Sequence, residues 1–64
     1  MSKITVSVDL EILAMTELSY FFTDGARRAW VQRRLIPNFD PDWEKGQTVE
    51  AEIPVWLAEK VGWV

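Results

Sequence analysis

Four carboxylates in two alternating segments are the residues of this sequence best arranged for chemistry. Asp9 and Glu11 alternate with apolar residues in one segment, and Glu50 and Glu52 do so in another. Alternation with period two places the acids of each segment on one face of a strand. If the two strands are neighbours, the four carboxylates form one anionic surface that suits a partner with a basic surface. A solvated face, with each acid paired to an arginine on a third strand, explains the same pattern without a partner.

A second candidate site is basic. Four arginines lie within eight residues, namely Arg27, Arg28, Arg33 and Arg34, and aromatic residues lie close to them at Tyr20, Phe21, Phe22 and Trp30. Arginines beside exposed rings form the platforms that bind single-stranded nucleic acid, so Trp30, Arg33 and Arg34 are an alternative binding site. The formal net charge of -3 favours the acidic surface, because nucleic-acid-binding domains are usually positive.

Residue types that are absent exclude most catalytic chemistry. The chain has no Cys and no His, which rules out disulfides, a Ser-His-Asp triad and a Cys-His pair. A pair of catalytic carboxylates needs a cleft wide enough for a sugar, which a chain of 64 residues rarely encloses. We therefore expect a binding protein that is not an enzyme and uses no cofactor.

The spacing Asp40-x-Asp42-x-Glu44 is similar to the start of a calcium-binding loop. Lys45 stands where that loop needs its glycine, and Ala51 stands where it needs its bidentate glutamate. Capping of a helical turn explains the acids better, so no metal site is predicted.

Alternation and β-forming residues predict four strands, and an apolar stripe bounded by Pro54 and Gly62 predicts a helix. The strands are expected at residues 4–14, 18–23, 29–36 and 48–53, a single helical turn at 40–46, and the helix at 55–61. The first strand is long enough to need a bend or bulge. Residues 1–64 are then one mainly β (β-rich α+β) domain, a small antiparallel SH3-like or OB-like barrel with a short C-terminal helix. An open antiparallel sheet with the helix on one face is the alternative.

The many aromatic residues are expected in the core, because so short a chain buries little surface without them. Trp56, Trp63 and Val64 are included in that core. A third functional alternative is a structural or assembly module that dimerises through Trp56 and Trp63, so the chain is expected to be a monomer or a weak dimer. No apolar run approaches a membrane span, and the start of the chain has no signal-peptide core, so we expect a cytoplasmic protein without a membrane partner.

The C-terminal run Ile53-Pro54-Val55-Trp56-Leu57-Ala58 resembles the tail of short orphan proteins encoded by phages and prophages. The Asp24-Gly25 turn followed by Ala29-Trp30-Val31 resembles their middle hairpin, although this chain continues with Val31-Gln32-Arg33-Arg34 where they carry Ile-Pro-Lys-Ser. In size, acidity and lack of catalytic residues the chain is also similar to the anti-CRISPR proteins of phages. That resemblance implies an inhibitor in the cytoplasm of the bacterial host, which mimics DNA and occupies a basic surface of a CRISPR effector complex through its acidic face.

Overall fold

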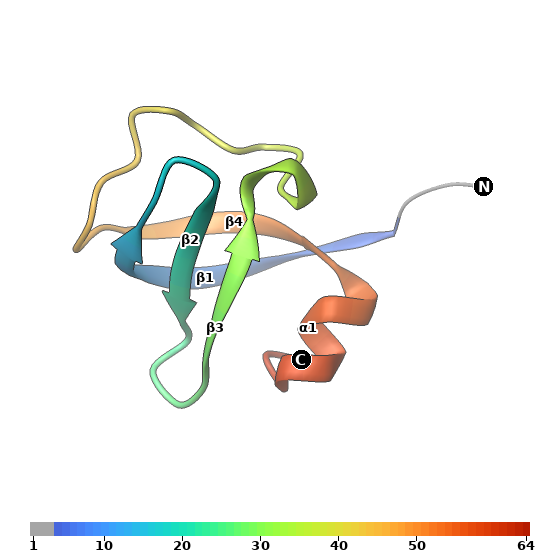
Figure 1. Cartoon of the computed structure of the whole chain (residues 1–64). Helices are drawn as coiled ribbons and strands as arrows, with labels where there is room; N and C mark the ends of the chain where they lie inside the picture. The colour runs from blue at the N-terminus through green and yellow to red at the C-terminus, as the bar shows by residue number, and fades with distance from the viewer. Residues whose placement is uncertain (1–3) are drawn as a thin grey trace.

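Four antiparallel strands form a single sheet in the computed structural model of the chain, which describes residues 4–64 (Figure 1). In chain order the elements are β1 (Thr5–Met15), β2 (Ser19–Thr23), β3 (Arg28–Gln32), the 3-10 helix η1 (Arg33–Leu35), β4 (Thr48–Pro54) and the helix α1 (Val55–Val61). The mainly β prediction is confirmed, and the predicted bounds of α1 agree with those of the structure.

The strand order is β3-β2-β1-β4, so the first and last strands of the chain are neighbours. β3 and β4 lie at the two edges, and the predicted closure of the sheet into a barrel is wrong. The segment that would have to supply a closing strand, residues 33–47, holds η1 and a series of turns. It also contains Pro37 and Pro41, which lack the N–H that a ladder requires. The open sheet considered as the alternative is therefore the observed arrangement.

β1 serves two partners along its length. Residues 5–11 pair with β4, and residues 11–15 pair with β2. The register with β2 shifts between Ile12 and Ala14, which confirms the predicted irregularity in this strand. Such a shift bends a strand and increases its twist. The bend allows one eleven-residue strand to contribute to both halves of the sheet.

The core lies on one face of the sheet and is covered by α1 and the chain end. Its largest fully buried side chains are Leu10, Ile12, Tyr20, Phe22, Val31 and Ile53. Leu57 and Ala58 add the buried stripe of α1. Burial of each large apolar side chain contributes roughly 1.5–3 kcal/mol, so this cluster is the main source of stability.

The chain end is fastened by Trp63. Gly62 ends α1 in the left-handed conformation (φ 94°), which turns Trp63 back under the sheet. The ring N–H of Trp63 donates to the carbonyl of Arg27 at 3.0 Å, and the side chain is 8% exposed. The core position predicted for Trp63 is confirmed. The same prediction is wrong for Trp56 and Val64, which are 58% and 64% exposed, because a seven-residue helix presents only one stripe to the core.

The segment after β3 differs from its prediction. β3 ends at Gln32 instead of residue 36, and residues 36–47 cross from the β3 side of the sheet to the start of β4 (Figure 1). Instead of a helical turn at 40–46 there are separate turns, one of which is closed by the N–H of Asp42 on Asp40 Oδ1 at 2.8 Å. Phe39 and Trp43 pack edge to face at 6.5 Å and join the core. These two rings hold the loop against the sheet.

Candidate binding site

Strands β1 and β4 bring the four predicted acids onto one surface. In the register of the two strands, Asp9 lies directly opposite Glu50, Glu52 lies opposite Ser7, and Glu11 lies opposite Thr48. The alternate residues of both strands are buried in the core, which places all four acids on the other face. Three are exposed, and the fourth, Glu52, is half-buried. We call this set, Asp9, Glu11, Glu50 and Glu52, the acidic face.

The geometry of the Asp9–Glu50 pair follows from a contact at the edge of β4. The side-chain amide of Asn38 donates to the carbonyl of Glu50 at 2.9 Å and accepts from the N–H of Glu52 at 2.9 Å. The backbone groups of both glutamates therefore point away from β1. Asp9 and Glu50 form a pair without mutual backbone hydrogen bonds, the type in which facing side chains lie closest.

The strands that carry or flank the acidic face hold no opposite charge. β1 reads TVSVDLEILAM, β4 reads TVEAEIP and β2, the other neighbour of β1, reads SYFFT. The nearest strand with an arginine is β3, two strand spacings or about 10 Å from β1. Arg28 on β3 is separated from Glu11 by Thr23 of β2. No acid of this face therefore has an arginine on a neighbouring strand, and on the third strand, β3, Arg28 stands in the same row as Glu11.

Arg33 lies over the aromatic core instead of pointing to solvent. Its guanidinium carbon is 4.8 Å from the ring centroid of Phe39 and 5.1 Å from that of Tyr20. One of its terminal nitrogens donates to the carbonyl of Thr16 at 3.3 Å, and its buried Nε has no acceptor. Such a cation over two rings stabilises the fold by cation–π attraction. Arg34 is exposed, and its Nε donates to Gln32 at 2.7 Å.

Trp30 stands on the face of the sheet opposite the core, apart from Arg33. Its ring stacks on Phe21 with centroids 4.9 Å apart and is 52% exposed. Arg33, by contrast, covers Tyr20, whose ring belongs to the core side. The structure therefore separates Arg33 from Trp30, whereas Arg34 bonds to Gln32, which lies on the same face of β3 as Trp30. It places Trp30 on the same face as the carboxylates, two strands away from those on β1 and three strands away from those on β4.

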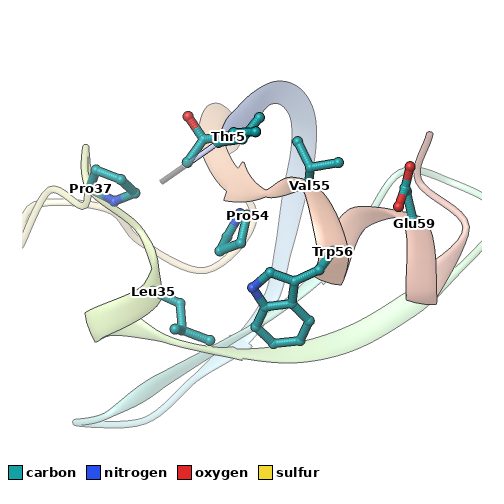
Figure 2. A pocket seen from close by; sticks show the side chains of 8 residues that line it. Thr5, Leu35, Pro37, Pro54, Val55, Trp56 and Glu59 are labelled. Carbon is teal, nitrogen blue, oxygen red and sulfur yellow. The ribbon is translucent and has the colours of Figure 1, made fainter. Parts of the chain in front are cut away.

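An apolar groove adjoins the end of β4, between the segment after β3 and α1 (Figure 2). It encloses about 400 Å³ and is lined by Ile4, Thr5, Leu35, Pro37, Pro54, Val55, Trp56 and Glu59. Figure 2 shows the ring of Trp56 directed toward Leu35 and Pro54. We call it the Trp56 groove. Sequence reasoning did not predict this groove. A signal for it was present, because Trp56 lies beside the apolar stripe of the helix and not within it, a position that leaves its ring outside the core.

Two ionisable groups with shifted pKa values belong to the framework and not to these surfaces. Burial raises the pKa of Tyr20, an effect opposed by the nearby Arg33 and reinforced by Asp40, whose carbonyl accepts from the Tyr20 hydroxyl at 3.3 Å. In the β2–β3 turn, the N–H groups of Arg27 and Ala26 donate to Asp24 at 2.9 Å and lower the pKa of its carboxyl. Both groups are part of the local structure that holds β3 in place.

Comparison of the chain with protein families, curated proteins and solved structures finds no match. Among residues 4–64, no three metal-ligating side chains lie close enough to hold an ion. No helix in the same range is long and apolar enough to cross a membrane. The site must therefore be interpreted from its own geometry.

Proposed function

We propose that this chain is a non-enzymatic binding protein that places its acidic face on a basic surface of another protein. The observation that carries the proposal is the Asp9–Glu50 pair, two carboxylates directly opposite each other with no cation on β1, β2 or β4. Like charges in this position destabilise a sheet, by up to about 1 kcal/mol for each pair. A basic partner would relieve that repulsion, so the free energy by which the pair destabilises the free protein would add to the affinity of the complex.

The density of charge on this face supports a partner that binds nucleic acid. Three alternate rows of the β1–β4 ladder, those that face the side of the acids, carry one, two and one carboxylates. Alternate rows are about 6.8 Å apart along a strand, which gives about one charge every 3–5 Å. Each DNA strand carries one charge about every 3.4 Å along the helix axis. An acidic face of this density can compete for a Lys/Arg-rich channel.

The resemblance to short phage proteins and to anti-CRISPR proteins supplies the class of partner. We propose a phage-encoded inhibitor that acts in the cytoplasm of the bacterial host. It would occupy the basic nucleic-acid-binding surface of a CRISPR effector complex and so exclude DNA.

Charge reversal on the acidic face tests this function. The Glu50→Lys/Glu52→Lys variant should lose the protection of a phage from CRISPR targeting while keeping the wild-type circular dichroism spectrum. Asp42→Lys/Glu44→Lys makes the same change in net charge in the loop outside the acidic face, and it should retain protection. Binding to the target complex should also weaken with added salt, since charge attraction is screened. Full protection by the Glu50/Glu52 variant would refute the acidic-face mechanism.

Single-stranded nucleic acid is a second candidate ligand, favoured by the exposed Trp30 ring stacked on Phe21. Bases stack on such rings with little regard to sequence. Fluorescence anisotropy with a labelled single strand at low salt tests this alternative. No binding at micromolar protein would eliminate it, and a Trp30→Ala variant that binds as tightly as wild type would do the same.

A further inference from the structure

The Trp56 groove is continuous with the acidic face. Thr5 and Pro54 face each other in the β1–β4 register, one alternation beyond the row that holds Ser7 and Glu52. Strand alternation therefore puts them on the same face as the acids, and both also line the groove. The groove wall at Pro37 is followed by Asn38, whose side chain binds the backbone of Glu50 and Glu52. The groove and the acidic face therefore meet at this end of β1 and β4, where Thr5 and Pro54 belong to both, while Leu35 and α1 line the groove from the core side.

The groove is suited to an apolar side chain. Its volume of about 400 Å³ lies within the range of ligand pockets, and most of its lining is aliphatic, proline or tryptophan. Trp56 forms one wall and is 58% exposed, a large ring that its own chain leaves uncovered. The charged residue of the lining is Glu59, which has the same sign as the acidic face. An occupant of the groove that also carries positive charge would satisfy both features.

We propose that the Trp56 groove receives a bulky apolar side chain from the same basic segment that lies on the acidic face. This inference rests on the proposed function and specifies the chemistry of its partner. Glu52 is two residues and Glu50 four residues from Pro54, or about 7 and 13 Å along the strand. An extended partner segment therefore carries its Leu, Met or aromatic anchor about two to four residues from its Lys or Arg side chains.

Synthetic peptides provide the probe. One peptide of about ten residues alternates Lys and Thr and ends in a Leu anchor; a second has the Leu at the other end, and a control has Ser in its place. Full burial of a Leu side chain is favourable enough to give at least tenfold in affinity. We expect the better-matched anchored peptide to bind about tenfold more tightly than the Ser control, and to shift the indole N–H resonance of Trp56 in heteronuclear NMR spectra.

Two variants with exposed tryptophans replaced form a matched pair. Trp56→Gln should bind the anchored and control peptides equally, whereas Trp30→Gln, on the edge strand farthest from β4, should keep the preference for the anchor. Glu50→Lys/Glu52→Lys should weaken both peptides alike. A preference that survives Trp56→Gln, or an anchored peptide that leaves the Trp56 resonance in place, would overturn the inference.

The remaining outcomes separate the inference from the function on which it rests. If wild type binds all peptides equally and the charge reversal abolishes that binding, the acidic face stands and the groove does not receive the anchor. If no peptide binds, the proposed function fails and the inference fails with it. If light scattering shows a dimer that Trp56→Gln converts to a monomer, and the anchor has no effect, the occupant is a second copy of the chain and the inference is wrong.

Discussion

Replacing Glu50 by Lys should make the free protein more stable, although it damages the proposed binding surface. Glu50 lies directly opposite Asp9 in a pair whose side chains approach closely, because the contact of Asn38 turns the Glu50 carbonyl away from β1. Two carboxylates in this position repel each other, whereas Lys opposite Asp attracts. The substitution changes an exposed side chain and leaves the backbone contact with Asn38 unaltered.

The expected gain can be estimated from the register. Opposite residues of this pair type have Cα atoms about 4.5 Å apart, which puts flexible carboxylates roughly 6 Å from each other. Their repulsion at that distance is about 0.7 kcal/mol in water and about half as much at physiological salt. Replacing repulsion by attraction roughly doubles the effect, so Glu50→Lys should raise the free energy of unfolding by about 0.5–1 kcal/mol. In a domain of this size the midpoint of thermal unfolding should rise by about 3–6 °C.

Thermal unfolding followed by circular dichroism measures this gain, at low salt and at about 1 M salt. Glu50→Gln should give about half of the increase, and in an Asp9→Asn background the gain from Glu50→Lys should largely disappear, because the charge that it interacts with is then absent. At high salt the difference from wild type should largely disappear, because the Debye length falls to about 3 Å. A gain that is independent of salt and of Asp9, or no gain at all, would refute the pairing argument.

Three further predictions concern the framework. Because the folded state raises the pKa of Tyr20, the contribution of this group to the free energy of unfolding should be constant up to about pH 10 and fall as the pH rises through the folded pKa. The phenolate absorbance of this single tyrosine reports the titration, and Tyr20→Phe should remove the loss of stability at alkaline pH. Because the hydrogen bond from the Arg27 N–H lowers the pKa of Asp24, the ionised Asp24 carboxylate should stabilise the fold above about pH 4, and this stabilisation should be lost as the pH falls. Asp24→Ala should therefore lower the thermal midpoint at neutral pH, and the difference in midpoint from wild type should shrink in acid. Gly62→Ala and Gly46→Ala both place a side chain at a φ of 94°, so each should lower the free energy of unfolding by about 1–2 kcal/mol in denaturant titrations; the Cβ added at Gly62 lies 2.7 Å from the far end of the exposed Arg27 side chain, which can move aside, so this contact should add little.

Local signals made several elements predictable. The alternation of residues 4–14 identified β1, and Pro54 with Gly62 marked the bounds of α1. Features that depend on distant contacts were missed. The position of Arg33 over the rings of Tyr20 and Phe39 requires η1 to end β3 early, and no pattern around Arg33 indicates this. The exposure of Trp56 depends on which side of α1 meets the core.

The candidate site shows the same division. The sequence by itself determined which face of each strand carries Asp9, Glu11, Glu50 and Glu52, because side chains alternate along any strand, and it excluded catalysis by His or Cys because neither residue is present. Only the tertiary structure decided that β4 lies beside β1, that no arginine lies on an adjacent strand, and that an apolar groove continues the surface. The physical reason is that strand pairing joins residues about forty positions apart in the chain, as with Asp9 and Glu50, and the choice of neighbour depends on how the whole core packs and not on any local pattern.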